Sequence, residues 1–362
     1  MNSEDKVYRN LQKHLDEQTL GFPETQSGSD IDLLRQLFTP AQAEIAMMLR
    51  YRYDSLEQIQ DRAAKAGKSI EQTERLLDQA AGKGVIGHRV KDGIKQYRVL
   101  PYVIGFLENV IHSAPPELMA AHLRYSEDGL FWRDYLKTKI PQMRTIPIQK
   151  SIKTRHHIGT YDEIKKLIET SDGPITVIEC ACRSGAEKRG EPCKKTSRKE
   201  TCLHFRDIAR FLLEKARVGR QISKVEALDI LQKNQEDGLV LQPANSQAPD
   251  AICSCCGCCC APLKAHHALP NPLSHWATNF YAQVNPEICS GCGLCEERCQ
   301  AAAMKLDEDR RAAIVDLTHC LGCGLCVEVC PEDAIELRNS SVEVVPPSTS
   351  EEMTEVIMAG KS

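Results

Sequence analysis

The apolar positions of the N-terminal third repeat at helical spacing after three recognisable helix starts. Thr39, Ser55 and Ser69 each precede a Gln by three residues, a capping-box pattern that marks the first turn of a helix. After Ser69, apolar residues recur on one face of a helix over residues 70–81. The pattern therefore predicts three helices in this part of the chain.

A β-hairpin is predicted directly after these helices. Two runs with apolar positions, 85–90 and 94–100, flank Asp92-Gly93, and Asp-Gly between such runs is typical of a tight hairpin turn. Three helices and a hairpin predict a winged helix-turn-helix domain over residues 31–104. The helix that would read DNA carries three acidic side chains against one arginine, which favours an interaction or structural role over binding of nucleic acid.

The segments on either side of this domain differ from it in pattern. Proline punctuates a mostly helical stretch before residue 150, a short apolar strand covers residues 174–179, and helices are predicted at about 203–217 and from the Ser223 cap to Asp237. The last residues are rich in Ser, Glu, Thr and Pro and lack periodicity. The predicted segments are an N-terminal helical extension (1–30), a helical connector (105–150), a central domain (151–275) and a disordered tail (339–362).

Composition narrows the class of protein. The chain has 362 residues, 42% of them hydrophobic and 27% charged, with a net charge of −4, which is the range of ordinary globular proteins. No apolar run reaches the roughly 18 to 20 residues of a membrane helix, and the polar start does not resemble a secretory signal. We therefore expect a cytoplasmic location. None of the 18 cysteines precedes Cys180, and in a reducing compartment such clustering favours metal ligation over disulfides.

Eight of the cysteines form a repeat near the C-terminus. The sequence Cys-x2-Cys-x2-Cys-x3-Cys occurs twice, 31 residues apart, at Cys289, Cys292, Cys295 and Cys299 and at Cys320, Cys323, Cys326 and Cys330. A [4Fe-4S] cubane needs four converging thiolates, and such a loop supplies three of them from one segment. Zinc sites usually show two separated Cys-x2-Cys pairs instead. The repeat predicts two [4Fe-4S] clusters.

These motifs resemble the bacterial two-cluster ferredoxins over residues 281–338, within a domain expected to span 276–338. In that arrangement the fourth cysteine of each motif binds the other cluster. The resemblance thus implies that cluster 1 is bound by Cys289, Cys292, Cys295 and Cys330, and cluster 2 by Cys320, Cys323, Cys326 and Cys299. One departure is Gln300, where such ferredoxins usually have the proline seen at Pro331. We expect an α+β multidomain fold: winged-helix-like domain, mostly helical central cysteine-rich domain, and C-terminal ferredoxin-like domain.

Ten further cysteines lie between the predicted winged helix and this repeat. Four of them, Cys180, Cys182, Cys193 and Cys202, suffice for a third metal site, and the many basic residues around them would favour thiolates and an anionic cluster. An iron-sulfur cluster is the preferred interpretation. A zinc site and a set of reactive redox thiols remain as alternatives.

The other six cysteines fall within eight residues. Cys253, Cys255, Cys256, Cys258, Cys259 and Cys260 are costly to keep as free thiols unless a soft metal binds them. Adjacent residues of an extended chain point to opposite sides, so the six cannot all face one site. Several of them could complete the site begun by Cys180 and Cys182. Three nearby histidines, at positions 204, 266 and 267, are more simply explained by packing than by ligation.

Segments 37–44, 179–183, 253–260 and 289–292 together resemble a family of iron-sulfur proteins from anaerobes. In that family a winged-helix-like segment precedes a central cysteine region and a two-cluster ferredoxin domain. The resemblance implies an electron-transfer protein that relays low-potential electrons between a partner redox enzyme and a central cluster. Two alternatives stay open: an oxidoreductase with the central cluster as active site, although no Gly-x-Gly-x-x-Gly fingerprint is present, and a redox-responsive transcription regulator.

Overall fold

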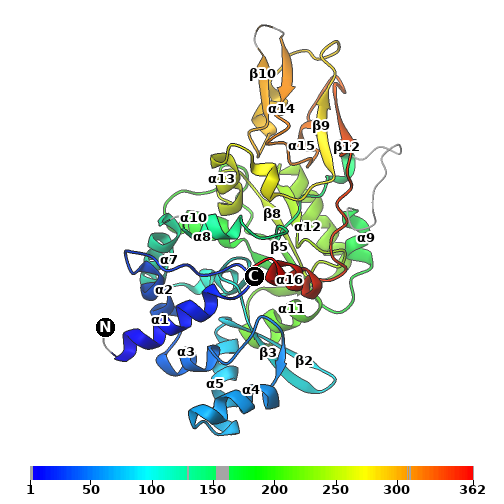
Figure 1. Cartoon of the computed structure of the whole chain (residues 1–362). Coiled ribbons are helices and arrows are strands. Elements are labelled where there is room, and N and C mark those ends of the chain that lie inside the picture. Colours follow the sequence, from blue (N-terminus) through cyan, green and yellow to red (C-terminus); the bar gives the residue numbers. More distant parts are fainter. Residues whose placement is uncertain (1–2, 129, 152–162, 308, 310, 362) are drawn as a thin grey trace. The chain divides into compact units, whose positions relative to one another are not determined.

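In the computed structural model of the chain (Figure 1), the three predicted helix starts all form capping boxes. The side chains of Thr39, Ser55 and Ser69 each accept a hydrogen bond from the backbone N–H three residues later, and the Gln at that position bonds back to the cap. They open helices α3 (Pro40–Ala46), α4 (Leu56–Ala63) and α5 (Ile70–Gly82). These predictions are confirmed.

The predicted hairpin is also confirmed. Strands β2 (Ile86–Lys91) and β3 (Ile94–Val99) pair in antiparallel fashion, with Lys91 opposite Ile94. The turn residues Asp92 and Gly93 have φ values of 52° and 76°, as a two-residue primed turn requires. The short strand β1 (Asp54–Ser55) adds to the other side of β3, so the sheet order is β1-β3-β2.

The structure describes residues 3–128, 130–151, 163–307, 309 and 311–361, which form two compact units. Unit 1 comprises residues 1–139, 207–220 and 354–362, and unit 2 comprises 140–206 and 221–353. Part of the predicted central domain, 152–162, lies outside the described residues. The remaining helices wholly or mainly in unit 1 are α1 (Ser3–Asp16), α2 (Ser29–Leu37), α6 (Leu107–Val110), α7 (Pro116–Glu127), α8 (Leu130–Tyr135), α11 (Arg206–Phe211) and α16 (Ser350–Ala359).

Helix α16 corrects the prediction of a disordered tail. Its residues Met353 and Ile357 are buried, although the segment around them is rich in Ser, Glu and Thr. Two apolar residues four apart are enough to bury one stripe of a short helix, and this signal is too brief to stand out in the sequence. In the described part of the chain, no helix has the length and apolar character needed to cross a membrane.

Unit 2 contains a five-stranded sheet in the order β6-β4-β5-β8-β7, with antiparallel pairing between β4 and β5, β5 and β8, and β7 and β8. Its strands are β4 (Ile175–Glu179), β5 (Glu200–Phe205), β6 (Arg220–Ile222), β7 (Val240–Pro243) and β8 (Ala251–Cys255). Helices α9 (Ile164–Glu169) and α12 (Lys224–Glu236) contribute to the core beside it. Helices α10 (Ala181–Lys188) and α13 (Ala261–Ala268) each begin immediately after a cysteine.

The sequence predicts only the first strand of this sheet. The central domain is expected to be mostly helical, so the other four strands are a difference from that prediction. Residues 203–217, predicted to be helical, begin as strand β5. The strands are short, and β8 ends among cysteines whose spacing hides the period-2 pattern of a strand.

The C-terminal part of unit 2 is built from two similar halves. Strands β9 (Phe280–Val284) and β12 (Ile335–Asn339) form one antiparallel pair, and β10 (Met304–Asp307) and β11 (Ala312–Val315) form another. Helices α14 (Leu294–Arg298) and α15 (Leu325–Glu328) occupy equivalent places in the repeat. Strand β9 from the start of the repeat therefore pairs with β12 from its end, which ties the two halves together.

A buried asparagine joins the strands that carry cysteines. The Nδ2 of Asn234, on α12, donates to the carbonyl oxygen of Thr201 on β5 at 3.1 Å and to the hydroxyl of Ser254 on β8 at 2.8 Å. Its Oδ1 accepts a hydrogen bond from Arg198 at 2.9 Å. Asn234 has no exposed surface, so its side chain links β5, β8 and Arg198 from a buried position.

Replacing Asn234 with Leu should loosen the cysteine-bearing strands. The change leaves a buried carbonyl and a buried hydroxyl without their partner, at a cost of about 1–3 kcal/mol for an unsatisfied group. We expect faster amide hydrogen exchange in peptides covering β5 and β8. The control is Gln232→Leu on the same helix, because Gln232 is exposed and bonds only to Glu236 among the described residues. Equal protection in the two variants would contradict the role given to Asn234.

Candidate metal centres

The two cysteine loops of the C-terminal repeat interlock through glycines. Gly291 and Gly322 have φ values of +68° and +65°, in the left-handed region that favours glycine. A Cβ on Gly291 would lie 2.6 Å from the carbonyl oxygen of Arg311, and one on Gly322 would overlap the carbonyl oxygen of Phe280. Residues 291 and 322, and likewise 280 and 311, are 31 positions apart, so each loop packs against backbone from the other half.

Backbone N–H groups point at four of the cysteine sulfurs in the same symmetric way. Ala313 and Ala282 donate to Cys289 and Cys320 at 3.5 and 3.3 Å, so the strand of each half serves the loop of the other. The fourth cysteine of each motif accepts a bond from the residue four positions later, at 3.3 Å for Cys299 and 3.2 Å for Cys330. Such N–H···S bonds stabilise thiolates and tune the potential of a bound cluster.

The fourth cysteine of the first motif faces the second loop. Burial, with smaller contributions from the nearby Cys299 and Cys320, raises the pKa of Cys323 to about 12. Burial also raises the pKa of Cys320, with Cys299 again among the neighbours that add to the shift. Cys299 is thus close to the second loop although it belongs to the first motif, as crossed ligation requires.

These loops lie in a segment whose sequence is similar to known proteins. Residues 282–337 match the family model of the 4Fe-4S dicluster domain. Residues 282–337 form a 4Fe-4S dicluster domain. A probable ferredoxin of Methanosarcina thermophila is 46% identical over 33 residues, which are 9% of this chain and 57% of that ferredoxin. The dicluster domain implies two [4Fe-4S] clusters, whose chemistry is the exchange of single electrons.

A second group of cysteines lies outside the dicluster domain. The Sγ atoms of Cys193, Cys256, Cys258 and Cys259 all lie within 4.8 Å of one another, and among the described residues no other set of three or more Cys, His, Asp or Glu donors is grouped so tightly. Three of the separations, Cys193–Cys256, Cys256–Cys258 and Cys258–Cys259, are 3.6, 3.5 and 3.7 Å. This four-cysteine group could hold a metal ion.

The sulfur separations indicate what kind of metal centre fits. A single tetrahedral ion with metal–sulfur bonds of about 2.3 Å sets its sulfurs about 3.8 Å apart, which is close to the separations observed. A cubane places an iron at each of four corners, so its ligand sulfurs stand farther apart. The eight cysteines of the dicluster domain are all described, and no three of them are gathered within 4.8 Å. The four-cysteine group therefore has the size of a site for one ion.

The remaining six cysteines form a closed ring, which we call the six-cysteine ring. Each thiol shifts the pKa of two others at close range, in the order Cys180, Cys182, Cys260, Cys255, Cys253, Cys202 and back to Cys180. Four of the six are buried, and Cys182 and Cys253 are partly buried. Hydrogen bonds from Cys202 and Cys255 lower the pKa of Cys253 to about 5 against the effect of burial.

The structure thus divides the ten central cysteines differently from the sequence-based grouping. Cys180, Cys182, Cys193 and Cys202 were expected to form one site, but Cys193 lies with the four-cysteine group and the other three with the ring. The spacing of Cys193 along the chain does not indicate that it lies apart from the other three. As expected, the segment 253–260 does not face a single site, and it contributes three cysteines to each group.

Arg183, one of the basic residues near the central cysteines, is a buried cation in the structure. Its guanidinium is 3% exposed and donates to the carbonyl oxygen of Ser254 and the hydroxyl of Thr201, both at 2.7 Å. Among the described residues no carboxylate pairs with it. Burial alone would lower the pKa of Arg183, but nearby Cys180 and Cys202, with other ring and group cysteines, raise it overall. The cysteine sulfurs are thus the acidic groups nearest to this arginine that favour its charged form.

Gln300, the departure from the ferredoxin pattern, joins the dicluster domain to the central cysteines. Its side-chain Oε1 accepts a hydrogen bond from the N–H of Gly257 at 3.0 Å, and its carbonyl oxygen bonds to His267 Nε2 at 2.8 Å. A Cβ on Gly257 would lie 2.7 Å from that carbonyl oxygen. Gly257 stands between Cys256 and Cys258, so a residue next to Cys299 directly contacts the loop of the four-cysteine group.

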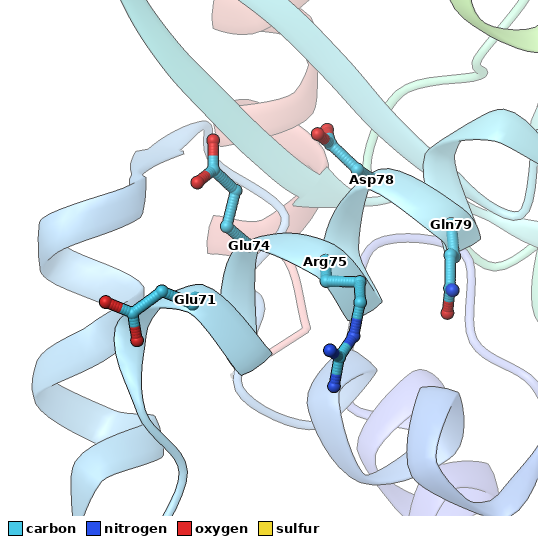
Figure 2. A pocket seen from close by; sticks show the side chains of 5 residues that line it. All are labelled: Glu71, Glu74, Arg75, Asp78 and Gln79. Atoms are coloured by element: carbon cyan, nitrogen blue, oxygen red, sulfur yellow. The ribbon is translucent and has the colours of Figure 1, made fainter.

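The pocket on helix α5 in unit 1 has a different character. Figure 2 shows its lining, which is acidic except for one arginine and one glutamine: Glu71, Glu74, Arg75, Asp78 and Gln79. Lys95 on β3 binds Glu74 at 2.7 Å and Asp78 at 3.2 Å, and Lys215 binds Asp78 at 2.6 Å. Lys95 and Lys215 are therefore each paired with acidic side chains of this helix.

An alanine at Gly322 should disrupt the dicluster domain. The residue would keep a left-handed backbone, which costs about 1–2 kcal/mol, and its Cβ would also overlap the carbonyl oxygen of Phe280. We expect a marked loss of bound iron after anaerobic purification. Gly293→Ala is the matched control, because Gly293 has φ +76° and nothing within 4 Å of an added Cβ. Equal iron content in the two variants would show that the close approach is unimportant.

Proposed function

We propose that this protein is an iron-sulfur electron-transfer protein that relays low-potential electrons between a partner redox enzyme and a metal centre built by the central cysteines. The observation that carries the proposal is the contact of Gln300 with Gly257. It places the residue after Cys299, a ligand expected for cluster 2, against the loop that carries Cys256 and Cys258. A freely acting ferredoxin has no need of such a connection to a second cysteine-rich site.

The environments of the two loops support a direction for the relay. Cys292 in the first loop is exposed, and the apolar side chains of Ile288 and Leu294 beside it are 50% and 45% exposed. In the second loop Cys320 and Cys326 are buried. We infer that a partner protein docks at the first loop, where a cluster is close to solvent, and that the covered second loop serves the inner transfer.

The crossed ligand sets that the ferredoxin resemblance implies are part of this proposal. Cys289, Cys292, Cys295 and Cys330 bind cluster 1, and Cys320, Cys323, Cys326 and Cys299 bind cluster 2. Sharing ligands between the two halves keeps the clusters at a fixed separation, because neither half can move without breaking both sites. The N–H···S bonds from Ala282 and Ala313 act across the halves in the same way.

The regulator alternative is disfavoured by the charges of unit 1. We infer a winged-helix arrangement for α3, α4, α5 and the β2–β3 hairpin, with a structural or docking role. On the hairpin, Arg89 and Arg98 lie over the ring of Tyr53, at 4.1 and 4.6 Å from its centre, and Lys95 is held by acidic residues of α5. Phosphate recognition needs free cationic groups, and these three are engaged.

Pairs of substitutions test the crossed ligation. Cys299→Ser with Cys320→Ser removes two ligands from one cluster if ligation is crossed, so we expect the loss of about four irons. Cys299→Ser with Cys289→Ser removes one ligand from each cluster, and we expect the loss of up to about eight. The readouts are iron content and the EPR spectrum of the reduced protein. The reverse pattern would show that each motif binds its own cluster.

The relay itself is tested by reduction of the whole protein. After anaerobic reduction, the protein should show EPR signals of [4Fe-4S]⁺ clusters and should pass electrons to an artificial acceptor. Absence of reducible clusters would refute the proposed function. Turnover of an organic substrate, with the artificial acceptor taking up the electrons, would instead favour the oxidoreductase alternative.

DNA binding provides a further discriminator. Because three of the four Lys and Arg side chains of the hairpin are engaged, we expect no gel retardation of genomic DNA fragments by the oxidised or the reduced protein, even at low salt, where phosphate contacts are strongest. Retardation in one redox state and not the other would support the regulator instead.

A further inference from the structure

The six-cysteine ring remains unexplained by the relay as proposed so far. The four-cysteine group already has the four ligands that one tetrahedral ion needs, so it has no use for the other thiols. The ring is assembled from separate elements: the turn after β4, helix α10, strand β5, strand β8 and the start of α13. The antiparallel register of β5 and β8, with Leu203 opposite Ile252, sets Cys202 on β5 beside Cys253 on β8, and Cys255 follows Cys253 on the same face of β8.

Several positive groups converge on the ring. Cys180 and Cys260 are the N-cap residues of α10 and α13, and the N-terminus of each of these eight-residue helices carries partial positive charge and unpaired N–H groups. Arg183 adds a buried full charge whose hydrogen bonds go only to neutral oxygens among the described residues. Six neutral thiols would leave this charge buried without compensation, which is strongly unfavourable. An anionic centre held by thiolates compensates it.

We propose that the six-cysteine ring binds a polynuclear iron-sulfur cluster with more than four irons, and that the four-cysteine group binds a single metal ion. The proposal rests on the proposed function and makes the ring cluster the inner redox centre of the relay. A [4Fe-4S] cubane offers four iron corners to protein ligands, whereas the ring presents six thiols without a break. Thiolate is also the ligand that selects iron-sulfur clusters over harder metal sites.

The position of the four-cysteine group fits this division. Its residues 256–259 lie in the chain directly between the ring ligands Cys255 and Cys260, and its Gly257 bonds to Gln300. One tetrahedral ion there would fix the loop between the ring and the dicluster domain, and so fix the distance that electrons must cross. The segment 253–260 needs six cysteines because it serves both centres.

Iron, zinc and acid-labile sulfide counts on the full chain, purified anaerobically, test the proposal. With about eight irons in the dicluster domain, we expect more than about twelve irons per chain. Cys202→Ser with Cys255→Ser should remove more than four irons together with sulfide. Cys256→Ser with Cys258→Ser is the matched control, because it should remove one metal ion and no sulfide. In both variants the EPR signal of the reduced dicluster domain should persist.

The outcomes separate the two proposals. Loss of only four irons and four sulfides from the ring variant would mean that the ring holds a cubane with spare thiols. No loss of iron would mean that the ring holds no cluster. Either result overturns the ring proposal, whereas an intact EPR signal from the dicluster domain leaves the relay proposal standing. If the unaltered protein shows no EPR signal from a reduced dicluster domain, the relay proposal itself is overturned. Should the ring variant fail to fold, Mössbauer spectra of the unaltered protein decide: the iron outside the two [4Fe-4S] clusters must exceed four atoms in an exchange-coupled centre.

Discussion

The distance between cysteine sulfurs is the constraint on which the rest of this structure depends. A thiolate binds metal only where the backbone presents its Sγ at the spacing the metal imposes. In the dicluster domain, glycines at positions 291 and 322 allow each loop to lie against backbone of the other half, and the sulfurs are held apart. In the four-cysteine group they are 3.5–3.7 Å apart where adjacent. The same residue type thus builds centres of different size.

Such spacing also decides how charge is balanced. Sulfurs crowded in a buried place repel one another once ionised, so positive groups must accompany them. The dicluster domain meets this need with backbone N–H groups, as at Ala282 and Ala313. The ring meets it with two helix N-termini and Arg183. Two basic residues of the surrounding loop, Arg198 and Lys199, pair instead with acidic side chains.

The sequence predicts the structure correctly where residues close together in the chain determine it. Capping boxes, the Asp-Gly hairpin and the repeated cysteine motif all act within a few residues, and the structure contains each of them. The ring and the four-cysteine group depend on strand pairing between β5 and β8 and on a loop that returns Cys193 to residues 256–259. Pairing of distant strands has no local signature, so the grouping of Cys193 could not be predicted. The tail helix was missed because only two apolar residues mark its buried side.

Gln300 shows how a departure from a familiar pattern can be interpreted physically. Proline at this position, as at Pro331 in the second motif, has no side-chain acceptor and could not bind the N–H of Gly257. The repeat therefore keeps the ligands of both halves but differs at a position where the first half bonds to the central loop. A difference confined to the half in contact with another cysteine site is expected if that half has a particular partner within the chain. The asymmetry of the dicluster domain then matches the two tasks that we propose for it: docking of a partner protein at the exposed loop beside Cys292, and transfer to the central cysteines at the end beside Cys299.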